Sequence, residues 1–159
     1  MKVYTVQDKD FLEFVDSNGF IVPNIKENLE PELKDWLNDM SDVYSWMAEK
    51  YYEKTGIPND RCLFWFYFRM RDINWKHIDF NKYNVYCFEV PNKLLHRNFL
   101  WSDLIDWHWH LNHLDGWEDK LDIFDFKLNN HDKNIVPQGV TTRIRKDWIK
   151  KIYTKSILK

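Results

Sequence analysis

Short runs in which apolar and polar side chains alternate recur along the chain, and a period of two is typical of β-strands. The four clearest runs span residues 3–7, 62–69, 83–90 and 138–144. In the second run, Phe64, Phe66 and Phe68 fall on one face, which is predicted to be core. The other face, which combines apolar surface with hydrogen-bonding groups, carries Leu63, Trp65, Tyr67 and Arg69.

Apolar side chains recur at helical spacing between these runs. The predicted helices span residues 8–19, 32–37, 41–54, 102–114 and 146–158. Asp8, Ser41 and Ser102 are the residue types that cap helix N-termini. The interleaving of strands and helices predicts an α+β fold, a single mixed domain over residues 1–159. We expect one small sheet of about four to six strands with helices packed on it.

Length and polarity place the chain among ordinary globular proteins. Its 159 residues are enough to bury one core without disulfides or metal. The first ten residues are mixed and charged, unlike a signal peptide, and no apolar run is long enough to span a bilayer. We therefore expect a cytoplasmic protein that has no membrane partner.

Scarce cysteine and glycine exclude several kinds of site. Cys62 and Cys87 are the two cysteines, and we expect both to be reduced, buried thiols. Without a CxxC pair, a zinc ribbon or a thioredoxin-type site is excluded. Four glycines are too few for a P-loop or a dinucleotide-binding fingerprint, because backbone approaches phosphate there through several glycines.

Charge is unevenly distributed on a chain whose formal net charge is −2. Residues 103–125 hold seven acids and one lysine, and residues 143–159 hold seven bases and one aspartate. Such segments commonly face each other or solvent. Alternatively, the basic C-terminal helix contacts nucleic acid.

Aromatic residues are abundant, with nine Trp, eight Tyr and eleven Phe. Part of this set must form the core, and the rest can line a pocket. Trp65, Tyr67 and Arg69 would make a stacking platform for a flat ligand, with Arg69 holding a phosphate or carboxylate. The alternative is a half-buried sheet face that a helix covers.

The 102–114 helix supplies further candidates. His110 and His113 share its solvated face with Asp103 and Asp106 and lack the spacing of a known metal motif, so no metal site is predicted. His108 lies at the edge of the apolar stripe, with Asn112 one turn further along. These two side chains either satisfy buried backbone groups or line a pocket.

Polar side chains also mark two strand ends. Gln7 closes the first predicted strand and Gln138 opens the last. A glutamine at such a position often satisfies a nearby loop, and it can equally bind a ligand. With His108, Asn112, Trp65, Tyr67 and Arg69, they complete the candidate ligand-binding residues.

The chain resembles DUF3841, a bacterial and phage protein family of unknown function. Four stretches carry the resemblance: Val3-Tyr4-Thr5-Val6-Gln7 followed by Gly19; Tyr44-Ser45-Trp46-Met47; Ser102-Asp103 with Trp107-His108 and Leu111-Asn112; and Trp117-Glu118 with Ile123-Phe124-Asp125, then Gln138. The family's second aspartate falls on Ile105, and its aromatic residue in the last strand falls on Thr142. The resemblance implies a fold and a setting, but no activity or cofactor.

Three functions fit these observations. The leading hypothesis is a binding domain with an aromatic cleft for a nucleotide-like ligand, between the Trp65 strand and the His108 helix. The first alternative is an NAD-using enzyme, because an aromatic-Thr strand followed by a helix and a glycine is loosely similar to the opening of ADP-ribosyltransferase-like domains. The second alternative is a protein-interaction or inhibitor protein of phage or defence type that has no pocket.

Overall fold

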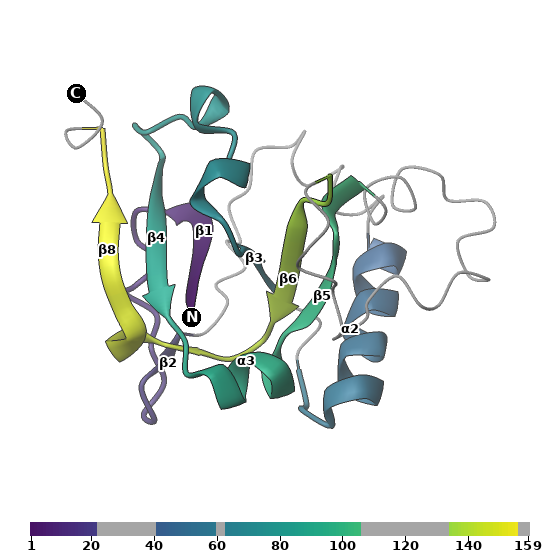
Figure 1. Ribbon diagram of the computed structural model, residues 1–159. Helices are drawn as coiled ribbons and strands as arrows, with labels where there is room; N and C mark the ends of the chain where they lie inside the picture. Colours follow the sequence, from purple (N-terminus) through teal and green to yellow (C-terminus); the bar gives the residue numbers. More distant parts are fainter. Residues whose placement is uncertain (22–40, 60–62, 106–133, 156–159) are drawn as a thin grey trace.

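A computed structural model describes residues 1–21, 41–59, 63–105 and 134–155 (Figure 1). Its strands, in chain order, are β1 (Lys2–Asp8), β2 (Phe20–Ile21), β3 (Phe64–Tyr67), β4 (Tyr83–Glu89), β5 (Leu100–Asp103), β6 (Pro137–Thr141), β7 (Ile144–Arg145) and β8 (Ile149–Tyr153). The helices are α2 (Ser41–Thr55) and α3 (Asn92–Asn98), with 3₁₀ turns at Met70–Asp72, Trp75–His77 and Lys146–Trp148.

Six of these strands form one antiparallel sheet in the order β5-β6-β3-β1-β4-β8, and β2 pairs with β7 in a small second sheet. The large sheet runs from β8 on the left of Figure 1 to β5 on the right, where α2 lies beside it. The α+β prediction, with one sheet of four to six strands, is therefore confirmed. The four alternating runs correspond to β1, β3, β4 and β6.

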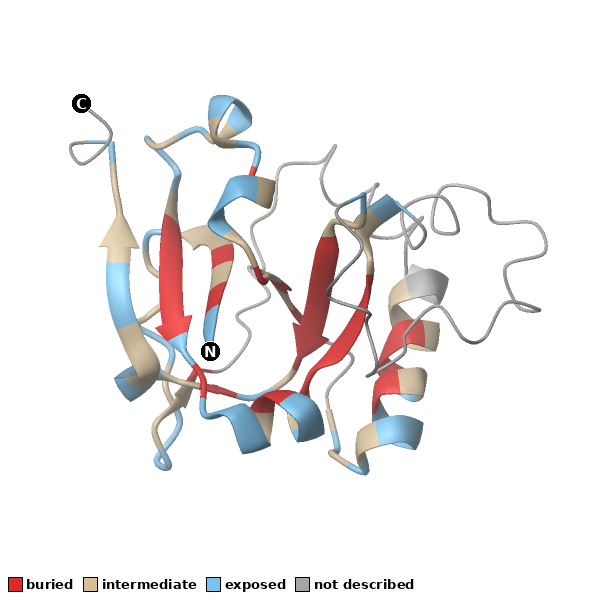
Figure 2. Cartoon of the chain, in the orientation of Figure 1, coloured by how far each residue is buried: buried red, intermediate tan, exposed pale blue. Residues whose placement is uncertain are grey.

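One face of the large sheet carries an aromatic core. Phe64, Phe66 and Phe68 are each at most 6% exposed, as the alternation predicted. Their rings meet others mostly edge to face, as Phe66 does with Phe99 at 5.5 Å between ring centroids. Strand β6 is buried along its length in Figure 2, whereas β3 alternates between buried and intermediate residues. Burial of such large rings supplies much of the hydrophobic stabilisation.

Helix α2 confirms the prediction for residues 41–54 and packs at the β5 end of the sheet. Met47 and Tyr51 are both fully buried, and they cluster with Leu100 of β5 and Val140 of β6. The hydroxyl of Tyr51 donates a 2.8 Å hydrogen bond to the carbonyl of Asn98. This bond joins α2 to the end of α3, so the helix is fixed by both apolar and polar contacts.

The predicted helix over residues 8–19 is wrong, since the structure has hydrogen-bonded turns there. The Asp16 carboxylate accepts 2.9 Å bonds from the backbone N–H groups of Asn18 and Phe20, and Gly19 adopts a φ of +82°. A short acidic side chain that binds nearby N–H groups stabilises a turn in competition with a helix. The similarity to ADP-ribosyltransferase-like domains required a helix between the first strand and Gly19, and the structure has no helix there.

The predicted basic C-terminal helix is also wrong over residues 146–155. A 3₁₀ turn leads into β8, which pairs with β4 in the register Tyr153↔Val85 and Lys151↔Cys87. Without β8, the N–H and C=O groups on the outer edge of β4 would lack these backbone partners. That long-range pairing outweighs helical spacing in a segment whose isoleucines pack against the core.

Ser102 is not the predicted helix cap, because it lies inside β5 in register with Gln138. Oδ1 of the next residue, Asp103, accepts hydrogen bonds from the N–H groups of Ile105 (3.1 Å) and Val136 (3.2 Å). Residues 106–114 of the predicted helix lie outside the described residues. The predicted strand 138–144 is divided between β6 and β7. The predicted helix over 32–37 lies outside the described residues.

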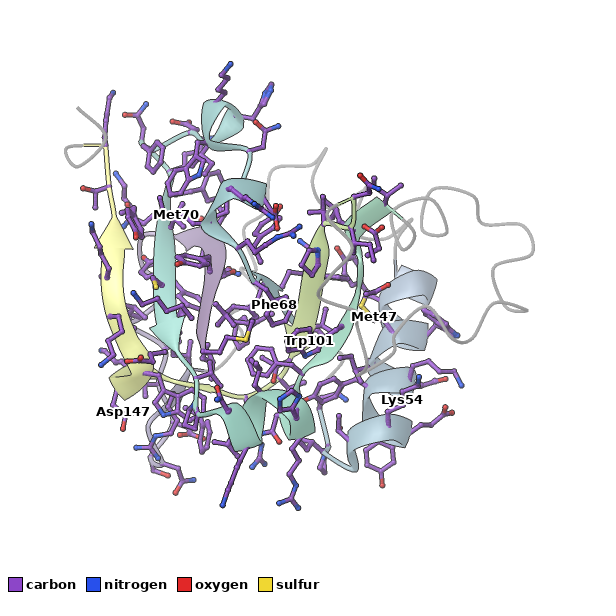
Figure 3. All side chains as sticks on the ribbon, viewed as in Figure 1. Met47, Lys54, Phe68, Met70, Trp101 and Asp147 are labelled. Atoms are coloured by element: carbon purple, nitrogen blue, oxygen red, sulfur yellow. The ribbon has the colours of Figure 1, made fainter. Side chains whose placement is uncertain are left out.

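Gly139 of β6 allows an aromatic side chain to lie directly over the strand. A Cβ atom at this position would lie 2.6 Å from Cζ of Phe68 and 3.1 Å from the carbonyl oxygen of Leu100. The Phe68 ring stacks on Trp101 with 3.9 Å between centroids, and Figure 3 shows these two side chains together. The stack restricts how far the Phe68 ring can move away.

Substituting Gly139→Ala should therefore lower the free energy of unfolding by about 1–3 kcal/mol, the usual effect of overpacking a core. Urea denaturation measures this. The penalty should shrink when Phe68→Leu is already present, because the clash partner is then smaller and more flexible. Equal penalties in both backgrounds would contradict this account of Gly139.

Candidate functional site

The sheet face opposite the phenylalanine core carries two rows of side chains that cross the strands. The strand registers place an apolar row across β5, β6, β3, β1 and β4, formed by Leu100, Val140, Trp65, Val6 and Val85. The second row, here called the polar row, crosses the same strands and consists of Ser102, Gln138, Tyr67, Tyr4 and Cys87. Residues directly paired in antiparallel strands point to the same face.

Helix α2 covers the β5 end of the apolar row. Trp65 packs against the cluster of Met47, Tyr51, Leu100 and Val140. Of the two interpretations of Trp65, the face covered by a helix is therefore the one the structure shows. This leaves the polar row as the candidate site.

Tyr67 and Gln138 form the centre of the candidate site, and both were predicted site residues. They are direct cross-strand partners. Gln138 is 5% exposed, and its side-chain Oε1 is buried with no hydrogen-bond partner within the described residues. Burial raises the pKa of the Tyr67 phenol, and the nearby carboxylate of Asp72 raises it further. The phenol therefore remains a neutral donor over the physiological range.

An acceptor such as this amide oxygen is costly to bury without a donor. Native proteins satisfy the large majority of buried polar atoms, and each exception calls for an explanation such as a ligand, an ion or water. Within the polar row, the Gln138 amide is thus the group that most directly indicates a bound molecule, because its buried oxygen needs a hydrogen-bond donor.

Arg69 follows β3 and is engaged within the protein. Its Nε donates a 2.5 Å hydrogen bond to Oδ2 of Asp72, whose side chain is 8% exposed. Its guanidinium also donates to the carbonyl of Ile135. These contacts tie the segment before β6 to the turn after β3. The geometry therefore favours a structural role for Arg69 over the predicted grip on a phosphate.

Gln7 is separated from the other candidates. It shares the phenylalanine side of the sheet with Thr5, and its Nε2 donates a 2.9 Å hydrogen bond to Oγ1 of that residue. The structure therefore brings Trp65, Tyr67 and Gln138 to one face and places Gln7 on the other. His108 and Asn112 lie outside the described residues, so their place at the site stays a prediction.

Three members of the polar row were missed as candidates: Ser102, Tyr4 and Cys87. Cys87 is a buried free thiol, as predicted, and Cys62 lies outside the described residues. The Cys87 thiol shares a hydrogen bond with the Tyr4 phenol, and burial raises the pKa of both groups. Alternation showed which way each side chain points, but only the strand registers reveal that these residues are neighbours.

Comparison with known proteins adds no relative: no protein-family model, curated protein or solved structure matches the chain. Across the described ranges, His, Cys, Asp and Glu side chains form no group of three or more that could hold a metal ion. In the same part of the chain, no helix is both long and apolar enough to cross a membrane.

The Cys87 thiol should react slowly in the native protein, because it is 2% exposed and its raised pKa lowers the thiolate fraction. The measurement is labelling with an aromatic disulfide reagent in a Cys62→Ser variant, which isolates the single remaining thiol. Labelling should be much slower in buffer than in denaturant. Equal rates in the two conditions would show that Cys87 is exposed.

The protein should also lose stability at alkaline pH. Burial raises the pKa of Tyr4, Tyr44, Tyr67, Tyr86 and Tyr153. Above about pH 10 the unfolded chain releases these protons before the folded chain does, so the free energy of unfolding falls as pH rises.

A Tyr67→Phe variant should show a shallower loss, by up to about 1.4 kcal/mol per pH unit, the limit for one proton. Urea denaturation between pH 8 and 11 compares the two proteins. An identical slope would mean that the Tyr67 phenol ionises equally readily in the folded and unfolded states.

Proposed function

We propose that the chain is a binding domain for a small, flat, nucleotide-like ligand, which lies on the polar row at Tyr67 and Gln138. The observation that carries the proposal is the buried Gln138 Oε1 without a donor among the described residues. A ligand that presents an N–H or O–H group at this point would remove the cost of the unsatisfied acceptor.

The chemistry of the row narrows the ligand class. A glutamine amide offers an acceptor and two donors, a pattern that matches the edge of an adenine base. An exocyclic amino group would donate to Oε1, whereas a carbonyl at the same place would repel it. The neighbouring Tyr67 ring is half-buried and offers a flat apolar surface for the same base.

The predicted roles of His108 and Asn112 are consistent with this site. The chain leaves β5 at Asp103, which pairs with Pro137, the residue before Gln138. Asp103 therefore lies beside the polar row, and His108 and Asn112 follow it in the sequence. We also propose, on sequence grounds alone, membership of DUF3841 and a cytoplasmic location, with which the free thiol of Cys87 agrees.

Substituting Gln138→Met tests the function directly. If Oε1 recognises an amino group, the wild type should bind adenosine 5′-monophosphate more tightly than inosine 5′-monophosphate, and Gln138→Met should weaken adenosine nucleotide binding about tenfold. Its stability should be unchanged or slightly increased, because an unsatisfied buried acceptor has been replaced by an apolar group of similar shape. Isothermal titration and urea denaturation provide the two readouts.

Gln7→Met is the matched control, since it makes the same chemical change on the opposite face of the sheet. It should leave nucleotide binding unaltered. The proposal fails if the wild type binds neither nucleotide. It also fails if Gln138→Met lowers the free energy of unfolding by about 1–3 kcal/mol without altering binding, since Oε1 would then be satisfied within the protein.

A further inference from the structure

A second cluster of aromatic and basic side chains lies at the β8 edge of the sheet. It joins two segments that are distant in sequence, residues 74–83 and 149–155. The Trp75 ring meets the Tyr153 ring edge to face at 5.6 Å between centroids, and Lys155 Nζ lies 3.4 Å from Oδ1 of Asn81. We call Trp75, Phe80, Tyr153, Lys151 and Lys155 the β8-edge cluster.

The rings of this cluster are held in place without being part of the core. Trp75 and Phe80 are nearly parallel, with 6.4 Å between centroids and 15° between ring planes. The indole N–H of Trp75 donates a 3.1 Å bond to the carbonyl of Met70, at an exposed position. All three rings of the cluster are only half-buried, so each retains surface on which a flat group can stack.

The two segments that carry these rings are rich in lysine. The two segments contain five lysines and a single aspartate, although the whole chain carries a formal charge of −2. The ammonium group of Lys151 lies 4.6 Å from the centre of the Tyr153 ring. Lys150, the neighbouring base, forms a 2.9 Å ion pair with Glu89. Lys151 therefore places a cation directly beside one ring of the cluster, whereas the charge of Lys150 is paired with a carboxylate.

Half-buried rings interleaved with lysines match the chemistry of a single-stranded nucleic acid. Its bases are free to stack on aromatic side chains, while its phosphates pair with the cations alongside. Lysines on an edge strand also discourage sheet-to-sheet aggregation, but that role does not require ordered aromatic rings beside them. A duplex offers charge without exposed base faces and fits the rings less well.

We propose that the β8-edge cluster binds single-stranded nucleic acid, with bases stacked on Trp75 and Phe80 and backbone phosphates paired with Lys151 and Lys155. Lys151 is the cross-strand partner of Cys87 at the end of the polar row, but Trp75 and Phe80 belong to a segment outside that row. Substitutions at Trp75 and at Gln138 therefore test the two proposals separately.

Fluorescence anisotropy with end-labelled twelve-nucleotide oligouridylate and oligothymidylate tests the proposal. The wild type should bind at least one of them saturably, and more tightly than a hairpin duplex. Replacing Trp75→Leu should raise Kd about 5- to 150-fold, the range for losing one stacked base. The Lys151→Gln variant, which removes an exposed charge, should reduce the slope of log K against log salt by about 0.7. Circular dichroism verifies that each variant is folded.

Lys54→Gln is the matched control, because it removes the same charge from α2, on the opposite side of the molecule from β8 (Figure 3). It should bind the oligonucleotides as the wild type does, and so should Gln138→Met. The proposal is overturned if neither strand binds saturably, if the duplex binds equally well, or if folded Trp75→Leu keeps the wild-type Kd. A Lys151→Gln effect no larger than that of Lys54→Gln would also overturn it.

Discussion

Strand β1 joins the two halves of the sheet, and its alignment determines what every other strand presents to each side. Tyr4 lies opposite Tyr67 of β3 and opposite Cys87 of β4. A slip of one residue would turn the side chains of β1 over and would move Tyr4 into the phenylalanine core. The register is held because Val3 and Thr5 are both buried among the rings on that side, and the reversed arrangement would bury a phenol there instead.

Because of this alignment, the two faces of the sheet carry different kinds of side chain. One face is closed by rings that meet edge to face, together with the Phe68–Trp101 stack over Gly139. The opposite face receives α2 at the β5 end, over the apolar row. The polar row beside it contains the Tyr67 phenol, whose pKa is raised, and the Gln138 amide oxygen, which has no hydrogen-bond partner in the described part of the chain. The residues of the proposed binding site thus lie on the opposite side of the strands from the phenylalanine core.

Much of the fold could be predicted from local pattern, because alternation and helical spacing report burial directly. The runs around Phe66 and Val85, and helix α2, were found in this way. The errors occurred where a distant or polar contact decided the outcome. The Asp16 carboxylate stabilises a turn where apolar spacing predicted a helix. Residues 149–153 form strand β8 because they pair with the edge of β4.

The candidate site was predictable to a similar degree. Alternation placed Tyr67 on the right face, and strand position singled out Gln138. That Tyr67 and Gln138 are cross-strand partners could not be predicted, because the register of β3 with β6 is not encoded in the pattern of either segment alone. Likewise, no local pattern predicts that Arg69 donates hydrogen bonds to Asp72 and to a distant carbonyl. The hydrogen bond from Gln7 to Thr5 was equally unpredictable.

The central position of β1 has a consequence for how the protein is made. Strand β1 is synthesised before β3 and β4, the two strands with which it pairs, so it spends that interval without its backbone partners. Sheets built from such distant pairings fold slowly, because loop closure precedes any gain from contact. The pairing of β1 with β4 therefore requires that the chain up to Glu89 be present. Before that pairing, the apolar surface of the aromatic strand Phe64–Tyr67 would favour aggregation.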